Sequence, residues 1–496
     1  MTGRVRMRFS QEGGKSGRFL KPNPSRLPVF LLVCLSVCVA SRAEAGGLYF
    51  SDRGVRPMGR AGAFVAGADD LGAIWYNPAG LADAGTGVLA DFSWLRFGID
   101  YTRTLLIRDA DGTMREPQSP TVSGNSPVIP LPTLAWSYNF GAKKEWTIAG
   151  GVLAPYVALA SYPDTVTGPK GPEPSPARYT LGSFNGSLLA LPGLWAAYKP
   201  IEQVRFGFGV MALIGTFKST VTFSASPQDR LIGAPEQPEY DANAQLSVGP
   251  IFAPTANAGV TFVPHKQLRI GVSGQLPMII SSDATFKVRM PSDVVFDNAR
   301  QNGESAHVRF ELPAVLRAGI EVRPIDELRL EVAYVREFWT THHSIDAVPQ
   351  GMSIDGITGL PPHVAIPPIA IPRQFDNSNS YRLGGEYTFW AGGYKMDLRS
   401  GISYETSAVP PGYLSLSSLD FDKYVLSIGG GLYVGEHWRF DALYAHLFAS
   451  SVYVDPHAAQ IPRINPIKGN APFEPVNGGQ YSASADLIGV GLQYKF

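Results

Sequence analysis

The chain has 496 residues, of which 45% are hydrophobic and 17% are charged, and its 42 Lys and Arg balance its 42 Asp and Glu. The balance is uneven, because residues 1–45 hold 8 basic and 2 acidic residues and leave 34 basic against 40 acidic residues in the remainder. An acidic remainder excludes a protein whose main partner is nucleic acid, since such a protein needs a basic face. The remainder also has no run of roughly 20 apolar residues, which excludes a transmembrane helix there.

The amino-terminal 45 residues have the pattern of a secretory signal peptide. Residues 1–26 are basic and residues 27–40 are apolar. Ala43 and Ala45 then flank Glu44, which is the small-x-small pattern of a signal-peptide cleavage site. This pattern predicts that residues 1–45 are removed and that the protein is exported.

Both cysteines, Cys34 and Cys38, lie inside this leader. The mature chain therefore has no thiol for a disulfide or a metal site. A lipoprotein signal ending at Cys38 is the alternative interpretation of the leader, but Val37 is bulky where such signals have a small residue.

From Thr86 onward, apolar residues alternate with small or charged ones, which is the pattern of β-strands with one buried face. At the carboxyl end, one face carries Ile488, Val490, Leu492, Tyr494 and Phe496, while Gly, Gln and Lys occupy the other. In several of these segments an arginine occupies one of the non-apolar positions, namely Arg205, Arg269, Arg329, Arg382, Arg399 and Arg439.

The connections between these segments fall into two alternating classes. Short polar turns are expected at residues 141–144, 200–203, 264–266, 323–326, 391–394 and 435–437. Long loops rich in Pro, Gly and Ser are expected at residues 109–130, 158–185, 224–245, 290–305, 341–378, 407–422 and 449–480. These thirteen connections join fourteen strands when residues 86–108 are counted as one long first strand, bent at Gly98.

An even number of antiparallel strands, with short turns on one rim and long loops on the other, is typical of an outer-membrane β-barrel. The barrel must close, because an open sheet edge in lipid leaves backbone groups unpaired at several kcal/mol each. We therefore predict an all-β transmembrane fold, a 14-stranded antiparallel barrel over residues 86–496, with aromatic residues such as Trp146, Trp339 and Trp438 near the interfaces. A soluble β-sandwich or propeller would give the same alternation, but it fits the leader and the two loop classes less well.

Residues 46–85 lack the strand pattern and are rich in Gly and Ala. Asp69-Asp70 is a candidate cap for a short helix that opens at Leu71. Pro78 forces Asn77 out of the helical region, so this helix must stop there. Because the lumen of a fourteen-stranded barrel is too wide for strand side chains alone to fill, we predict that residues 46–85 form a hatch, or plug, inside it.

The mature chain resembles the FadL/TodX family of outer-membrane transporters of long-chain fatty acids and other hydrophobic compounds. The resemblance rests on Gly59-Arg60-Ala61, Ala68-Asp69-Asp70, Asn77-Pro78-Ala79-Gly80-Leu81, Glu311-Leu312-Pro313, Tyr381-Arg382-Leu383-Gly384, Gly401-Ile402-Ser403-Tyr404-Glu405 leading to Val409-Pro410, and the strand ending at Phe496. It implies a fourteen-stranded barrel, an amino-terminal hatch, a hydrophobic ligand beside the hatch, and lateral escape of the ligand through an opening made by a kinked strand. The long loops here are rich in Pro and show no long amphipathic helix, so the ligand need not be a fatty acid.

Within this resemblance, Asn77, Pro78, Ala79 and Gly80 are the candidate gate, although Asn77-Pro78 also fits a plain helix stop. Tyr49 and Phe50 follow the expected mature terminus and are candidates for the ligand pocket or for packing against the wall.

Arg317, Arg382 and Arg399 fall on the expected luminal face. Any one of them can meet a ligand carboxylate with two parallel hydrogen bonds, or pair with luminal acids such as Glu331, Glu386 and the hatch aspartates.

The sequence offers little support for enzyme or metal chemistry. His342, His343 and His363 lie in a polar loop without helical spacing and are interpreted as solvated loop histidines. No Gly-x-Ser-x-Gly context accompanies a histidine, as a serine hydrolase would need. We expect no cofactor and no metal.

The sequence therefore predicts a passive outer-membrane channel, not an enzyme, for hydrophobic small molecules such as long-chain fatty acids. Its expected partners are this ligand, outer-membrane lipids and lipopolysaccharide, but no nucleic acid, and it is expected to be a monomer. A lipid-modifying barrel enzyme and a structural or adhesive barrel are the alternatives.

Overall fold

The computed structural model describes residues 52–126, 129–154, 160–169, 171–228, 230–449, 451–468 and 472–496. The expected signal peptide, Tyr49 and Phe50 lie outside the described residues. Within them, no helix is long and apolar enough to cross a membrane.

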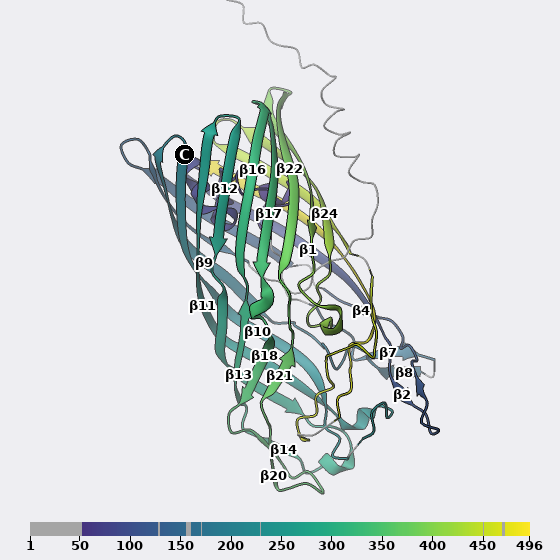
Figure 1. The fold of residues 1–496 in the computed structure, drawn as a ribbon. Helices are drawn as coiled ribbons and strands as arrows, with labels where there is room; N and C mark the ends of the chain where they lie inside the picture. Colours follow the sequence, from purple (N-terminus) through teal and green to yellow (C-terminus); the bar gives the residue numbers. More distant parts are fainter. Residues whose placement is uncertain are drawn as a thin grey trace, which may run out of the picture. The chain divides into compact units, whose positions relative to one another are not determined.

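Long antiparallel strands form the wall (Figure 1). The fourteen that make up the ring of described residues are β1 (Gly87–Arg103), β5 (Ile129–Phe140), β6 (Trp146–Leu153), β9 (Leu188–Ile201), β10 (Val204–Ser224), β11 (Asp241–His265), β12 (Leu268–Gln275), β16 (Ala314–Ile325), β17 (Leu328–Phe338), β22 (Ser378–Ala391), β23 (Tyr394–Glu405), β24 (Lys423–Val434), β25 (Trp438–Ala449) and β27 (Gly479–Lys495). The predicted fold class is confirmed.

The ring closes between its first and last strands. β1 pairs with β5 on one side and with β27 on the other, in one unbroken register from Gly87 opposite Lys495 to Arg103 opposite Gly479. The expected first strand at 86–108 was too long, because β1 ends at Arg103, and the expected bend at Gly98 does not interrupt its pairing with β27. Closure pairs both edges of the sheet, as a lipid environment requires.

The six expected short turns are where the sequence places them, between β5 and β6, β9 and β10, β11 and β12, β16 and β17, β22 and β23, and β24 and β25. The long loops carry more structure than expected. The remaining strands are β2 (Ile107–Arg108), β3 (Met114–Arg115), β4 (Val122–Gly124), β7 (Thr165–Gly168), β8 (Gly171–Pro174), β13 (Met278–Arg289), β14 (Arg300–Asn302), β15 (Ser305–Leu312), β18 (Ser344–Pro349), β19 (Ser353–Asp355), β20 (His363–Ala365), β21 (Ile369–Pro372) and β26 (Val452–Val454). Of these, β13 precedes the expected loop at 290–305 and continues the wall, because it pairs with β11 on one side and with β15 on the other. Several short strands, among them β2, β14 and β20, lie at the end of the barrel opposite the short turns (Figure 1).

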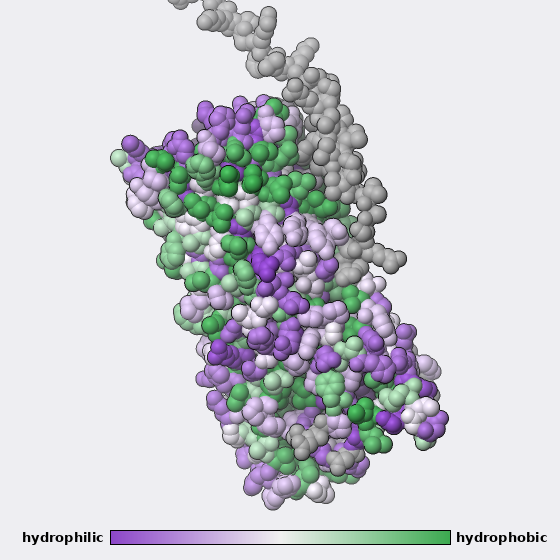
Figure 2. All heavy atoms as spheres, viewed as in Figure 1, coloured by the Kyte–Doolittle hydropathy of each residue, from purple (hydrophilic) through white to green (hydrophobic). Residues whose placement is uncertain are grey.

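The outer surface carries an apolar belt near the short-turn rim, below a polar edge (Figure 2). Large exposed apolar side chains of the strand segments adjoining these turns include Trp136, Tyr138, Phe140, Trp146, Phe206, Phe208, Phe262, Trp438 and Phe440. Such a belt with aromatic residues at its margin is what a lipid bilayer selects on a barrel.

Residues 52–85, here named the luminal segment, pack against the inward-facing residues of the strands. The segment contains α2 (Val55–Met58), α3 (Ala73–Tyr76) and the 3₁₀ helix η1 (Pro78–Asp83). Nearly all its side chains are buried. α3 begins two residues after the expected start at Leu71, because Asp70 accepts a hydrogen bond from the N–H of Gly72 at 2.9 Å and so holds a turn ahead of the helix.

Glycines on the wall allow the backbone of the luminal segment to approach closely. A Cβ atom on Gly207 of β10 would lie 2.1 Å from the carbonyl carbon of Pro78, and one on Gly401 of β23 would lie 2.4 Å from that of Arg60. No side chain fits at either position unless the luminal segment moves.

One part of the wall has no continuous ladder. β11 pairs with β12 near the short-turn rim and with β13 further along, but residues 249–255 of β11 and residues 277–283 form no ladder pairs with each other. Pro250, Pro254 and Pro277 lie in these stretches. Since proline has no N–H to donate to a ladder, these three positions offer no backbone donor across the gap.

We predict that Gly207→Ala displaces η1 while the barrel still folds. The added Cβ meets backbone atoms of Pro78, which cannot rotate away, and overpacking of this kind costs about 1–3 kcal/mol. Hydrogen exchange of residues 77–83 should then accelerate by roughly tenfold. Gly430→Ala is the matched control, because its Cβ would meet no atom closer than the Asp397 carbonyl oxygen at 3.5 Å; equal exchange in both variants would contradict the close packing.

Candidate functional site

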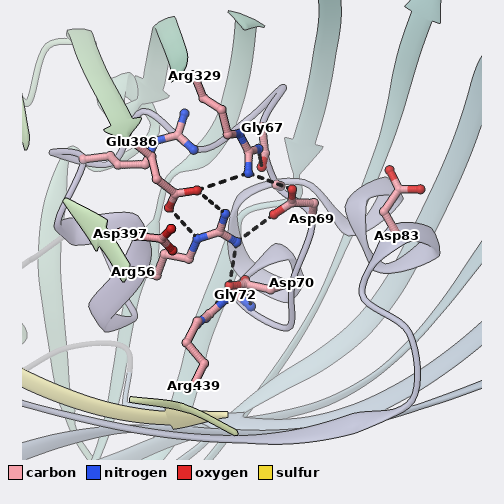
Figure 3. A network of polar contacts seen from close by, with 12 residues as sticks. Arg56, Gly67, Asp69, Asp70, Gly72, Asp83, Arg329, Glu386, Asp397 and Arg439 are labelled. Carbon is pink, nitrogen blue, oxygen red and sulfur yellow. Dashed lines mark hydrogen bonds and ion pairs between the residues drawn. The ribbon is translucent and has the colours of Figure 1, made fainter. Parts of the chain in front are cut away.

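A network of buried ion pairs joins the luminal segment to the wall (Figure 3). The Arg56 guanidinium donates to Asp69 at 2.7 Å and to both oxygens of Glu386 at 2.8 Å. Arg329 of β17 donates to Asp69 at 2.8 Å, and Arg439 of β25 donates to Asp70 at 2.7 Å. The two aspartates of the luminal segment are therefore held by strands that lie four places apart in the ring.

A second set of contacts holds the backbone of the luminal segment. Glu331 accepts hydrogen bonds from the N–H groups of Val65, Ala66 and Gly67 at 2.6, 2.8 and 2.9 Å. Arg60 lies 3.1 Å from Glu331, so the same carboxylate also balances a buried cation. Asp83 near the end of the segment pairs in a similar way with Arg205 of β10 and Arg269 of β12.

The four candidate gate residues adjoin β10 and β11. The Asn77 side-chain amide donates to Val65 O at 2.9 Å and to Thr261 Oγ1 at 3.0 Å, and its oxygen accepts from the N–H of Ala79 at 3.1 Å. Pro78, Ala79 and Gly80 form the first half of η1 and are buried. Asn77 thus caps η1 and also fastens the luminal segment to β11.

The wall and the long loops enclose an apolar cavity with an empty volume of about 1000 Å³, its opening included. Its apolar lining comes from the inner faces of β9, β10, β11, β13 and β15 and from loop residues, with Leu189, Leu213, Phe217, Ile251, Ile280, Phe310, Leu312, Trp339, Ile345, Phe375, Ala408, Val409 and Leu419. Pockets with an apolar lining and a few polar groups hold small organic ligands.

Charged residues gather on one part of the cavity lining. Lys423 pairs with Glu405 and, at 3.3 Å, with Asp420, and Glu337 accepts a hydrogen bond from the Trp339 indole at 2.8 Å. These groups have partners within the lining.

Arg373 and His342 are the two basic residues of the cavity that come from loops outside the strands of the ring. Arg373 is buried, and its Nη2 donates to Ser417 Oγ at 3.2 Å, while its Nη1 has no hydrogen-bond partner. Burial lowers the pKa of Arg373 to about 10, so it remains charged at neutral pH. Burial and the nearby Arg373 lower the pKa of His342 to about 4, so its imidazole is neutral.

The three candidate arginines take part in other contacts. Arg399 pairs with Glu386 at 2.7 Å and with Asp441 at 2.6 Å, and Arg382 pairs with Asp52. The guanidinium of Arg317 lies over the Trp75 ring, 5.2 Å from its centroid. Arg382 and Arg317 thus contact the luminal segment, whereas Glu386 and Asp441, the partners of Arg399, lie on β22 and β25 of the wall.

The histidine and tryptophan expectations need two corrections. His342 is buried and lines the cavity, so it is not a solvated loop histidine, because its ring packs against Phe375 at a centroid distance of 4.9 Å. Trp339 is buried beside it and does not belong to an interfacial girdle. His363 is exposed, as expected, and lies 2.9 Å from Asp355.

Sequence reasoning missed Arg373 and the loop residues that close the cavity, Ala408, Val409 and Leu419. The local signal was an arginine among apolar residues in Ile371-Pro372-Arg373-Gln374-Phe375. No periodicity marks these positions, since they reach the cavity from irregular loops.

The barrel is closed, its outer surface has an apolar belt, residues 52–85 pack against its inner face, and it contains an apolar cavity. These features define the chain as an outer-membrane barrel protein of the transport type. The model of the Outer membrane protein transport protein family (OMPP1/FadL/TodX) matches residues 36–496. The chain belongs to this family, and the predicted resemblance is confirmed.

Solved structures show the same fold at low sequence identity. A FadL homologue of Pseudomonas aeruginosa is 15% identical with a TM-score of 0.68, covering 91% of this chain and 100% of that one. The toluene transporter TbuX of Ralstonia pickettii is 16% identical with a TM-score of 0.56, covering 90% and 99%. The Pseudomonas putida toluene transporter TodX is 13% identical with a TM-score of 0.58, covering 92% and 100%. A search of curated proteins gave no match.

We predict that acid loosens the loops around His342. The unfolded histidine titrates near 6.5, whereas the folded one titrates near 4. The unfolded loop therefore binds more protons in this window, and stability is lost as pH falls from about 6.5 toward 4, by about 2 kcal/mol at pH 5. Hydrogen exchange of residues 339–345 and 369–377, corrected for intrinsic rates, measures this loss, and His342→Phe should abolish it. A pH response that survives in His342→Phe would assign the effect to another group.

Proposed function

We propose that this protein is a passive channel that takes up hydrophobic small molecules, such as long-chain fatty acids, across the outer membrane through the apolar cavity. The observation that carries the proposal is the cavity itself, whose lining is apolar on five strands of a barrel with an otherwise charged interior. Membership in a family of outer-membrane transport proteins supports it. The names of two structural relatives, both toluene transporters, also point to hydrophobic cargo.

The luminal segment acts in this proposal as a hatch that stays in place. Burial of about 300 Å² of ligand surface contributes about 7 kcal/mol at roughly 25 cal/mol per Å². Removal of one partner from a buried ion pair costs about 3–5 kcal/mol, and the segment is held by Arg56, Asp69, Asp70 and Asp83 in several such pairs. Ligand binding alone is too weak to expel the whole segment, so any gating at Asn77 to Gly80 is a local movement.

A ligand that cannot pass the hatch must leave sideways. We place the exit at the interrupted ladder between β11 and β13, because Ile251 and Ile280 line the cavity on these two strands. Residues 249–255 and 277–283 form no ladder pairs with each other, so their separation breaks fewer backbone hydrogen bonds than separation elsewhere along these strands. The ligand then enters the lipid without crossing water.

Uptake of labelled oleate by cells with and without the gene tests the function directly. Higher uptake with the gene is expected, whereas equal uptake would favour a lipid-modifying enzyme or an adhesive barrel. Neither alternative has support from the residues that line the cavity.

We predict that Leu213→Trp lowers uptake to about a tenth or less, because the indole occupies space that the ligand needs. Val210→Trp is the matched control, since Val210 lies on the same strand but is 50% exposed on the outer face. Heat-modifiable mobility on gels reports folding of both variants. Normal uptake by folded Leu213→Trp would exclude the cavity from the route.

We also predict that Pro250→Ala combined with Pro254→Ala slows release several-fold, since each substitution restores a backbone donor to the interrupted ladder. Ligand affinity at equilibrium should change little. Pro132→Ala serves as the control, because Pro132 lies in the continuous ladder between β5 and β1 opposite Phe92. An unchanged release rate in the double variant would place the exit elsewhere.

A further inference from the structure

A second cavity, which is polar, opens at the short-turn rim. Its empty volume is about 1050 Å³, its opening included. Its charged lining consists of seven basic and five acidic residues, namely Arg56, Arg269, Arg323, Arg329, Lys395, Arg439 and Lys495, with Asp69, Asp83, Asp326, Glu386 and Glu436. Because the short turns of an outer-membrane barrel face the periplasm, this cavity is open to solutes of that compartment. It shares no lining residue with the apolar cavity.

The two lysines of this lining have no acidic partner. Each of the five arginines forms a salt bridge with a carboxylate. Lys395 instead lies over the Tyr433 ring, 4.4 Å from its centroid, and neither Lys395 nor Lys495 forms a salt bridge with any residue that the structure describes. Asp326 and Glu436 are exposed in the turns that follow β16 and β24. The lining therefore has an excess of positive charge.

Polar side chains form a row across neighbouring strands inside this cavity. In the ladders, Lys395 of β23 lies opposite Tyr433 of β24, Tyr433 lies opposite Arg439 of β25, and Arg439 lies opposite Gln493 of β27. Residues paired in this way have Cβ atoms about 4.5–5.5 Å apart. Lys495 follows Gln493 by two residues, so it belongs to the same face of β27. All five residues line the cavity.

Two members of this row have unused hydrogen-bonding groups. Gln493 is 1% exposed, and neither its amide nitrogen nor its amide oxygen has a partner among the described residues. Because an unpartnered buried amide is destabilising, a ligand that supplies the missing partner is favoured there. Arg439 donates from Nε to Asp441 at 2.8 Å and from Nη2 to Asp70 at 2.7 Å (Figure 3), which leaves Nη1 as its remaining donor.

We infer that Arg439, Gln493, Lys395 and Lys495 form a binding site for a phosphate group, either free phosphate or the phosphate of a small phosphomonoester, at the periplasmic mouth of the barrel. A phosphate carries about −1.5 to −2 charges at pH 7 and has several strong acceptor oxygens. Its charge matches two lysines that lack carboxylates, and its oxygens accept from guanidinium, amide and ammonium donors. The cavity also has room for the organic part of a phosphomonoester. This site goes beyond the proposed function, which uses the apolar cavity.

Other ligand classes fit the polar cavity less well. Asp69, Asp83 and Glu386 are each held by arginines, so they are not open to a metal ion or an amine. A monocarboxylate carries one charge and leaves one of the two lysines without a counter-charge. Acetate is therefore the comparison that distinguishes a phosphate site from a general anion site.

The experiment measures binding to the full chain by isothermal titration calorimetry. The protein is held in nanodiscs of zwitterionic phosphatidylcholine at pH 7.5, in a buffer without phosphate, and the probes are inorganic phosphate, glycerol 3-phosphate and acetate. Wild type is expected to bind inorganic phosphate and glycerol 3-phosphate at least about tenfold more tightly than acetate, because the second charge adds a second charge-assisted contact.

Two changes to the site test its members. Lys395→Met combined with Lys495→Met should weaken phosphate binding about tenfold to a hundredfold. Gln493→Leu should weaken it roughly threefold to tenfold with no change in net charge. Lys143→Met combined with Lys266→Met is the matched control, because both are exposed lysines of short turns on the same rim. This control loses the same charge and should bind as wild type does, and heat-modifiable mobility checks that each variant is folded.

The phosphate site would be overturned if wild type bound neither phosphate nor glycerol 3-phosphate, or bound acetate as tightly as phosphate. A folded site-lysine double variant with wild-type affinity would overturn it too. An equal loss in the control variant would do the same, because it would show an effect of net charge on the whole rim. None of these results affects the channel function, which the uptake of oleate tests separately.

Discussion

The structure depends on the pairing of buried guanidinium groups with carboxylates between the luminal segment and the wall. Charges taken out of water are tolerated only when they meet partners of opposite sign with good geometry. Arg56 between Asp69 and Glu386, and Arg329 between Asp69 and Glu321, meet this condition. The interior near the short turns is therefore polar, and the luminal segment is held there by paired charges.

The apolar cavity begins where this charged packing ends, among the long loops. In the proposed route a hydrophobic molecule stays among these apolar side chains. Hydrocarbon cannot replace the partners of the buried ions, so the charged packing offers it no path. The lateral route proposed above follows from this contrast between the two ends of one lumen.

The alternation of residues was enough to predict the barrel, its strand number and its short turns, because a strand with one lipid face and one packed face must alternate. The glycine-rich composition of residues 46–85 pointed to a segment apart from the wall. The luminal arginines were correctly placed on the inner face, and Arg399 pairs with Glu386, one of the acids named for them. The partner of Arg382 was not predictable, since Asp52 is far from it in sequence. The cavity was the least predictable part: Arg373, Val409 and Leu419 come from loops whose paths depend on the whole fold. His342 was misinterpreted for the same reason, because its polarity suggested solvent while tertiary packing buried it.

The position of the luminal segment in the chain affects the order of assembly. Its ion-pair partners extend from Arg205 on β10 to Arg439 on β25. Contacts between residues so distant in sequence form late, because large loops must close first. Residues 52–85 precede every strand of the wall in sequence, so they reach their final ion pairs only after the strands up to β25 have formed.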